Sequence, residues 1–241
     1  MQRQRIVLQP AFLLHQSPYR DTSSLLELIS RDHGRVGLIA RGARRPKASL
    51  RAVLQPFQPL LVSWISRGDL GTLTGAEIVP SAITLPPPSV YSGYYMNELL
   101  VRLTRRHDAH PRLFTQYADA LEGLGDEHSD TRVLRLFEKN LLEELGYGLD
   151  LTQTVTGTAV SEDDTLYEYK LEHGVIHAES GCSEAMVFSG RSLLSLADER
   201  LDDETAIQDA RRLLRAVLEL YLGSRPLEVR RVARAMRRAL R

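Results

Sequence analysis

Apolar side chains at every second position dominate the first 80 residues and predict β-strands separated by turns rich in Gly and Pro. Five strands are expected, and they run through Ile6, Leu8 and Phe12–Leu14, then Leu25–Ile29, Val36–Ala40, Leu60–Ile65 and Thr72–Ile78. The second segment is ambiguous, because its apolar residues also fit one turn of a helix. Five short strands within residues 1–80 still favour a small closed barrel.

Three consecutive prolines follow this strand-rich part. The segment Thr84–Ser89 cannot continue a strand ladder and favours extended polyproline geometry, which predicts a stiff connector over residues 81–90. Beyond it the apolar period becomes 3.6, as in helices. Three helices are expected, over Tyr91–Arg105, from Pro111 to Leu124, and from Ser129 or Asp130 to Gly146. They predict a helical domain over residues 91–241.

Residues 150–190 interrupt the helical pattern. They are rich in Thr and Val, and Leu166–Leu171 alternates like a strand, which predicts a small insertion that contains β-structure. Two further helices are expected, one over Glu204–Leu222 that ends at Gly223 and one after Pro226. The pattern therefore predicts an α+β protein with an N-terminal five-stranded barrel and a mainly α-helical second domain.

Composition excludes several classes of protein. The longest uncharged stretch, residues 78–97, contains four prolines and cannot cross a bilayer as a helix. The start, Met1–Arg5, lacks the apolar core of a secretory signal, so a cytoplasmic protein is expected. Cys182 is the single cysteine, which excludes an internal disulfide and a Cys-rich zinc site.

The net charge is zero, but the charges are segregated along the chain. Residues 1–80 carry 11 basic and 5 acidic side chains, residues 81–200 carry 10 and 20, and residues 201–241 carry 10 and 6. This pattern suggests basic surfaces that meet a polyanion, separated by an acidic body. The alternative is that the acidic middle neutralises its own neighbours.

The densest cationic segment, Arg41–Arg51, follows the third predicted strand. It contains five cations and no acid, and its glycine and proline oppose regular structure. Such a loop is typical of phosphate contact, and the alternative is a solvated loop. The nucleic-acid contacts expected here from composition are Arg41, Arg44, Arg45, Lys47 and Arg51. Trp64 and Phe57 could stack on bases, but each lies in an apolar run that favours core packing.

The last predicted helix is amphipathic in an unusual way. At 100° per residue one face is basic and the opposite face is apolar. The basic face contains Arg230, Arg231, Arg234, Arg237, Arg238 and Arg241, and the apolar face contains Val229, Val232, Ala233, Met236 and Leu240. The basic face could bind DNA phosphates, bind an acidic protein tail or be simply solvated. We predict DNA contacts by Arg230, Arg234 and Arg237.

A third cationic group lies on the helix that begins near Asp130. Arg132, Arg135 and Lys139 are expected to share its exposed side beside apolar residues, where they could hold a peptide carboxylate. The alternative is that Glu138, Glu143 and the helix C-terminus neutralise these cations.

Motifs of catalysis are absent from the sequence. It contains no phosphate-binding GxxxxGK[ST] loop, no GxGxxG after a strand and no HExxH zinc motif. His107 and His110 are better explained as a surface pair than as metal ligands. No enzyme, cofactor or metal is expected, and a hydrolase whose Ser, His and Asp meet only in the folded chain is the rival without a supporting motif.

Seven segments, in order, resemble the RecO family of bacterial recombination mediators. They are Arg41–Arg44, Leu54–Leu61, Tyr91–Leu100, Leu134–Glu138, Leu145–Gly148, Phe188–Arg191 and Tyr221–Leu227. The resemblance implies an N-terminal OB-fold barrel joined to a helical domain. It also implies a non-enzymatic protein of DNA repair and recombination, cytoplasmic and associated with the nucleoid.

The resemblance further implies partners. Proteins of this family bind single- and double-stranded DNA, anneal strands coated by single-strand binding protein, and with RecR promote RecA loading. They also bind the acidic, apolar C-terminal tail of single-strand binding protein, which we assign to Arg132, Arg135 and Lys139. The rival interpretation is a protein-tail-binding adaptor with only incidental DNA contact.

One departure from the family pattern concerns zinc. Many relatives carry a four-cysteine zinc module after the segment that corresponds to Leu145–Gly148, whereas here residues 149–186 contain only Cys182. The sequence resembles a zinc-free branch, in which packing of Tyr167, Tyr169 and Leu171 is expected to replace the metal.

Overall fold

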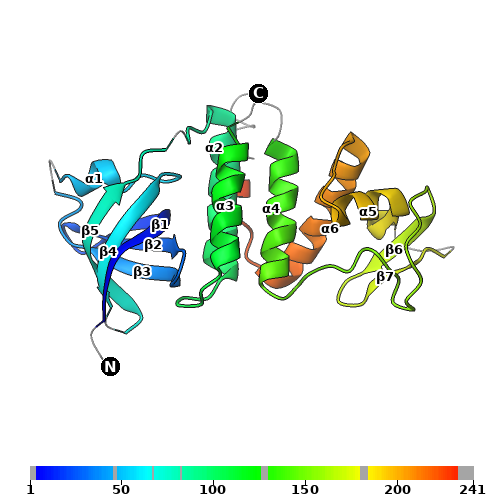
Figure 1. The fold of residues 1–241 in the computed structure, drawn as a ribbon, viewed down its shortest axis with the longest axis horizontal. Coiled ribbons are helices and arrows are strands. Elements are labelled where there is room, and N and C mark those ends of the chain that lie inside the picture. The colour runs from blue at the N-terminus through cyan, green and yellow to red at the C-terminus, as the bar shows by residue number, and fades with distance from the viewer. Residues whose placement is uncertain are drawn as a thin grey trace. The chain divides into compact units, whose positions relative to one another are not determined.

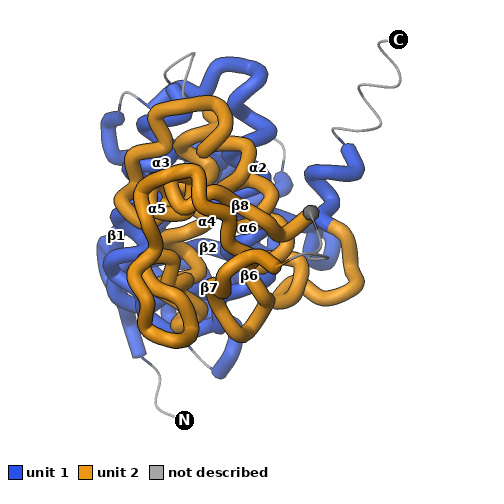
Figure 2. Tube along the Cα trace, turned by 90° about the vertical axis from the view of Figure 1, so that its right-hand side faces the viewer, with its two compact units in different colours: residues 1–127, 227–241 blue, residues 128–226 orange. Residues whose placement is uncertain are grey.

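The computed structural model describes residues 4–45, 48–66, 68–81, 83–125, 130–179 and 184–232. The chain forms two compact units (Figure 2). The first contains residues 1–127 and 227–241, and the second contains residues 128–226. The chain thus leaves the first unit and returns to it near the C-terminus. None of the helices in the described ranges is long and apolar enough to cross a membrane.

The first unit begins with a closed five-stranded barrel (Figure 1). Its strands are β1 (Gln4–Tyr19), β2 (Ser23–Ser30), β3 (Gly34–Ala40), β4 (Pro59–Ser66) and β5 (Leu70–Ile78). Neighbours are antiparallel except β3 and β5, and the order β1-β2-β3-β5-β4 closes when β4 pairs with β1. This is the topology of an OB-fold, so the predicted α+β class and the predicted barrel are confirmed.

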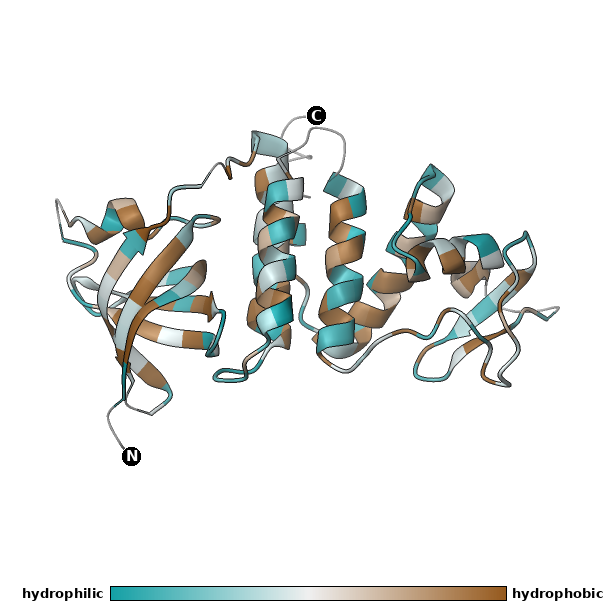
Figure 3. Ribbon diagram, viewed as in Figure 1, coloured by the Kyte–Doolittle hydropathy of each residue, from teal (hydrophilic) through white to brown (hydrophobic). Residues whose placement is uncertain are grey.

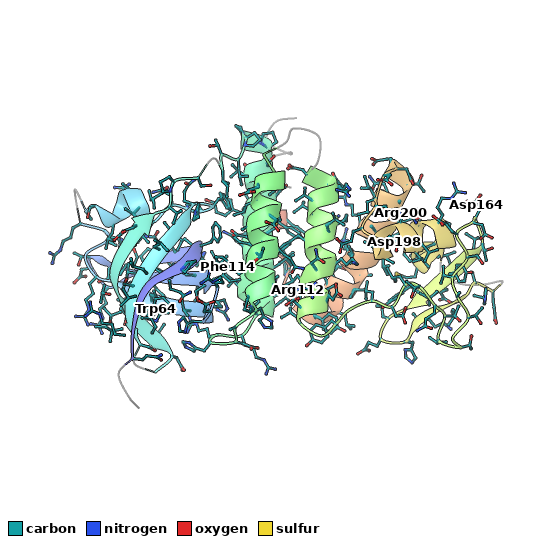
Figure 4. All side chains as sticks on the ribbon, viewed as in Figure 1. Trp64, Arg112, Phe114, Asp164, Asp198 and Arg200 are labelled. Carbon is teal, nitrogen blue, oxygen red and sulfur yellow. The ribbon has the colours of Figure 1, made fainter. Side chains whose placement is uncertain are left out.

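The barrel core explains why the ambiguous second segment is a strand. Leu26 and Leu28 both point into the interior and are fully buried. Residues two apart share a face in a strand but not in a helix, so their burial requires a strand. Hydrophobic residues run along all the strands (Figure 3). Trp64 lies in this core at 2% exposure and Phe57 is also buried, so core packing is confirmed for both rings (Figure 4).

β1 is longer than predicted, and two register shifts bend it. The register shifts between Ile6 and Gln9 against β4, and between Leu13 and His15 against β2. Each bulge re-aims the strand, so a single strand can pair with both neighbours and close the barrel. The short helix α1 (Leu50–Val53) lies at one end of the barrel, where Leu50 and Val53 pack on the core (Figure 1).

Two helices complete the first unit, α2 (Pro87–Leu103) and α3 (Pro111–Gly123). α2 begins at Pro87, inside the predicted polyproline connector, with Pro86 as its N-cap. Proline fits the first turn of a helix because the first N–H groups have no partner within the helix. Phe114 of α3 contacts Phe12 of β1, with ring centroids 5.4 Å apart, so α3 packs on the barrel (Figure 4).

A buried polar relay also joins these helices to the barrel. The Asn97 amide nitrogen donates to the Leu14 carbonyl at 3.0 Å, and the Tyr117 hydroxyl donates to the Asn97 amide oxygen at 2.6 Å. All three residues are nearly inaccessible, and burial raises the pKa of the Tyr117 hydroxyl well above its ordinary value. These two hydrogen bonds therefore fix how α2 and α3 pack on β1.

We expect Asn97→Ala to lower the free energy of unfolding by about 1–3 kcal/mol for each buried group left without its partner. Tyr117→Phe removes only one of the two bonds and should cost less than Asn97→Ala. Urea unfolding followed by circular dichroism measures both losses. Equal losses in the two variants would contradict the relay.

The second unit combines helices with a small sheet. Its elements are α4 (Asp130–Glu144), β6 (Leu166–Lys170), β7 (Gly174–His177), the 3₁₀ turn η1 (Glu184–Met186), β8 (Val187–Ser189), α5 (Gly190–Ala197) and α6 (Glu204–Leu222). The sheet order is β7-β6-β8, which agrees with the predicted β-containing insertion. α4 ends as expected, because Gly146 adopts φ +82° and the Tyr147 N–H reaches the Leu142 carbonyl.

Two features of this unit differ from expectation. α5 was not predicted, since its eight residues are too few to show a clear helical period; its start is stabilised by the Ser189 hydroxyl, which accepts from the Ser192 N–H. Tyr167 and Tyr169 are buried in the small sheet as predicted, but Leu171 is 36% exposed. Phe188, 2% exposed, fills the core instead.

Candidate nucleic-acid interface

The basic loop predicted from the sequence lies between β3 and α1. Gly42 adopts φ +70°, and the Arg45 N–H returns to the Gly42 carbonyl at 3.0 Å, so the loop opens with a tight turn. The Ala43 side chain is buried in the barrel core, and the Arg44 N–H donates to the Thr22 carbonyl. The backbone of this loop is thus fixed to the barrel while its long side chains project from it.

The arginines of this loop and of the first turn of α1 are solvent-exposed. Arg41, Arg44, Arg45 and Arg51 are all exposed, and none forms an ion pair with an acidic side chain in the described parts of the chain. The Arg44 guanidinium donates only to the Arg20 carbonyl, at 3.2 Å. Lys47 lies outside the described residues. Three arginines of the loop and Arg51 of α1, without an acidic partner in the described parts of the chain, form a surface that attracts phosphates.

The structure adds one cation that the sequence prediction missed. Arg20, in the turn between β1 and β2, is exposed and lies beside the basic loop because of the backbone bond from Arg44 to Thr22. Its guanidinium lies 5.4 Å from the centre of the Tyr19 ring. Arg20 is a single cation next to Asp21, so no local pattern marks it. We call Arg20, Arg41, Arg44, Arg45 and Arg51 the barrel arginine cluster.

The predicted orientation of the last helix is wrong at its described start. Residues 228–232 are helical, and the Glu98 carboxylate accepts the N–H groups of Glu228 and Val229 at 2.8 and 3.0 Å. Arg230 packs against α2, with its guanidinium 5.5 Å from the Tyr95 ring and bonded to the Tyr95 hydroxyl, whereas Val232 is 45% exposed.

The reason for this orientation is the partner surface on α2. Tyr95 offers an aromatic face that attracts the Arg230 guanidinium, and Glu98 caps the helix start, so Arg230 turns toward α2. Arg231 is exposed and pairs with Glu228. Arg234, Arg237, Arg238 and Arg241 lie outside the described residues, so the DNA contacts predicted for Arg234 and Arg237 stay predictions.

The cations of α4 do not share one exposed side. Arg135 is 6% exposed and its guanidinium donates to the Glu138 carboxylate at 2.6 Å. Arg132 donates to the carbonyls of Glu199 and Arg200, and Lys139 pairs with the Glu199 carboxylate at 2.8 Å. The expectation of a shared exposed face is therefore wrong for Arg135.

The physical reason lies in contacts within the second unit. Glu138 pairs with Arg135, and Glu199 of the turn after α5 pairs with Lys139. The carbonyls of that turn accept hydrogen bonds from Arg132, and its Arg200 pairs with Glu162 and Asp198 (Figure 4). The alternative of internal neutralisation thus describes α4 better, with Glu138 as predicted and Glu199 in place of Glu143.

The histidine pair considered as a metal site is part of a turn. The His107 N–H donates to the Arg35 carbonyl, and the His110 ring lies 3.5 Å from the Asp108 carboxylate. Over the described ranges, no group of three or more His, Cys, Asp and Glu side chains is placed to hold a metal ion. Cys182 lies outside those ranges.

Comparison with known proteins agrees with this architecture. The family model described as "Recombination protein O N terminal" matches residues 1–82, which contain the barrel, and "Recombination protein O C terminal" matches residues 88–231. The chain is 42% identical to "DNA repair protein RecO" of Azoarcus sp. (strain BH72) over 233 residues, which cover 95% of this chain and 96% of that protein.

Two further relatives cover the chain almost completely. "DNA repair protein RecO" of Aromatoleum aromaticum is 43% identical over 98% of both chains. The protein of the same name from Alkalilimnicola ehrlichii is 43% identical over 100% of this chain and 96% of its own length. With both family models matched in order behind an OB-fold barrel, the chain belongs to the RecO family of DNA repair and recombination proteins.

Proposed function

We propose that this protein is a recombination mediator that binds single- and double-stranded DNA and anneals complementary strands coated with single-strand binding protein. In this proposal it acts with RecR to promote RecA loading. The observation that carries the DNA part is the barrel arginine cluster, whose members have no acidic partner among the described residues. The family membership supports the partners.

The mechanism that we infer is electrostatic. Two DNA strands repel each other through their phosphates, and a protein that neutralises phosphates lowers this repulsion while releasing condensed counterions. Base pairing then supplies the driving force for annealing. No nucleotide hydrolysis and no covalent step are needed, so the protein acts as a mediator rather than as an enzyme.

Salt dependence tests the phosphate contact. Four arginines of the cluster, Arg41, Arg44, Arg45 and Arg51, that each neutralise one phosphate of a single strand predict a log-log slope of about −2.8, so affinity should fall roughly 50-fold between about 50 and 200 mM salt. Fluorescence anisotropy with a labelled oligonucleotide measures this slope. An affinity that does not change with salt would contradict the proposed function.

The residues are tested by charge reversal of Arg44 and Arg45 together to Glu. We expect at least a tenfold loss of affinity and a slope that is shallower by about 1.4, because two phosphate contacts are lost. The control reverses Arg211 and Arg225, which are exposed in the second unit, and so changes the net charge equally. Equal losses in both variants would mean that only net charge matters.

Annealing is tested on complementary oligonucleotides coated with single-strand binding protein, without ATP or added metal. The parent protein should anneal them and the Arg44→Glu/Arg45→Glu variant should not. Failure of the parent, together with intact binding of the tail peptide of single-strand binding protein, would favour the adaptor interpretation. On α4, such a tail would have to compete with Glu199 for Lys139.

A further inference from the structure

Two adjoining hollows open on the barrel beside the arginine cluster. The first, of about 350 Å³, lies between β1, the segment after α1, and Tyr94 of α2. The second, of about 320 Å³, lies between β1 and the basic loop. Gln16 and Arg51 line both hollows, so the two adjoin within the first unit, and we call the pair the groove.

The two halves of this groove differ in chemistry. The first is lined by apolar residues that include Leu54, by the polar side chains of His15, Gln16 and Gln55, and by one aromatic ring, Tyr94. The second is bordered by Arg44 and Arg51, which have no acidic partner among the described residues. An aromatic ring beside hydrogen-bonding side chains fits a flat heterocycle, and the cations of the second hollow fit phosphate.

The ring of Tyr94 is held ready for stacking. It is 40% exposed, although its inner edge packs against Phe57 with ring centroids 5.0 Å apart at 66°. Phe57 is itself buried, and Gly93 lies so close to it that a Cβ on Gly93 would stand 2.7 Å from the Phe57 ring. Phe57 thus supports the tyrosine, while 40% of the residue remains exposed. Such rigid amphipathic rings are typical stacking platforms.

We propose that this groove is a site for a single DNA strand, with a nucleobase stacked on Tyr94 and the adjoining phosphates on Arg51 and Arg44. The inference rests on the proposed function and deepens it, because it assigns recognition of bases to a residue of α2 outside the basic loop. A duplex keeps its bases stacked inside the helix and cannot place one in the hollow without unpairing. The arginines alone bind either form of DNA, and Tyr94 favours single strands.

The groove fits a strand better than a free nucleotide. Arg51 lines both hollows, and the basic loop carries two further exposed arginines, Arg41 and Arg45, that line neither, so the cluster holds more cations than one base and its phosphate need. This number of cations indicates a ligand with several phosphates.

The test compares three DNA ligands of equal length: a thymidine oligonucleotide, an abasic oligonucleotide and a duplex. Anisotropy at one salt concentration measures each affinity. The parent should bind the thymidine strand roughly 10- to 100-fold more tightly than the abasic strand, the range expected for a stacked base. Tyr94→Ala should abolish this preference and leave the affinities for abasic strand and duplex unchanged, whereas Tyr94→Phe should retain it.

Controls separate stacking from folding. Tyr91→Ala changes another exposed tyrosine of α2 that lines neither hollow, and it should behave like the parent. Tyr94→Leu keeps an apolar contact for Phe57 but lacks the ring, so it should also lose the preference if Tyr94→Ala proves unstable.

Two results would overturn the inference. One is a parent protein that binds thymidine and abasic strands equally, and the other is a Tyr94→Ala variant that weakens all three ligands alike. In both cases steep salt dependence would leave the proposed function standing. A parent that binds none of the ligands in a salt-dependent way would contradict the proposed function itself.

Discussion

Gly34→Ala is expected to lower the free energy of unfolding by about 2–5 kcal/mol. Gly34 begins β3 at φ +62°, where only glycine is free of steric cost. A Cβ at this position would lie 1.9 Å from the Asp108 carbonyl oxygen and 2.4 Å from the carbonyl carbon. These are backbone atoms, so they cannot move aside as a flexible side chain would. The barrel and the turn before α3 would have to separate.

Gly68→Ala is the matched control for this prediction. Gly68 has a similar φ of +75°, but a Cβ there would meet no atom within 4 Å. It therefore carries only the cost of the left-handed backbone, about 1–2 kcal/mol. Urea unfolding of both variants measures the difference, which isolates the clash with Asp108. If Gly34→Ala and Gly68→Ala lowered the free energy of unfolding equally, the contact of Gly34 with Asp108 would not limit the side chain at this position.

Glu27→Ala is expected to destabilise the first unit by about 3–5 kcal/mol, the usual cost of removing one partner from a buried ion pair. Glu27 is 8% exposed, and its carboxylate accepts from the guanidinium groups of Arg35, at 2.7 Å, and Arg106. Arg35 also donates to the Thr104 carbonyl at 3.0 Å. Without the carboxylate, two cations would face each other with no acid between them. Because Arg106 is partly exposed, the lower end of the range is expected.

Thermal or urea unfolding measures this loss, and Arg31→Ala is the comparison. Arg31 pairs with Asp32 on the same barrel, but both side chains are about half exposed, at 51% and 49%. Water competes with an exposed pair, so little change is expected. If Arg31→Ala and Glu27→Ala had similar effects, burial would not be what makes the Glu27 pairs important.

Periodicity alone predicted the five strands, the barrel and the first three long helices after it. These elements bury one face each, and burial imposes a period of two on strands and 3.6 on helices. β2 is the instructive case, because Leu25–Ile29 fits both periods locally. The choice was made by the neighbouring strands β1 and β3, which leave only an extended segment room to place Leu26 and Leu28 inside.

The candidate interface was predicted in part. The basic loop is compact in sequence, so its cations could be found by counting charges, and the structure shows that the described arginines are exposed and unpaired. Arg20 joins them through two contacts of Arg44, whose N–H donates to the Thr22 carbonyl and whose guanidinium donates to the Arg20 carbonyl. Tyr94 faces the same groove from α2, and nothing in its local pattern separates it from the other tyrosines of that helix.

The class of the fold, the order of its main elements and the position of the basic loop follow from the amino-acid sequence, because each depends on neighbours along the chain. Which cations are available for binding depends on the folded chain. Arg135 is buried with Glu138, Arg230 rests on Tyr95, and Lys139 is paired with Glu199. A charged side chain is free or neutralised according to the residues that lie next to it in the folded chain. These residues belong to distant segments, or they are brought close by the way in which a helix packs.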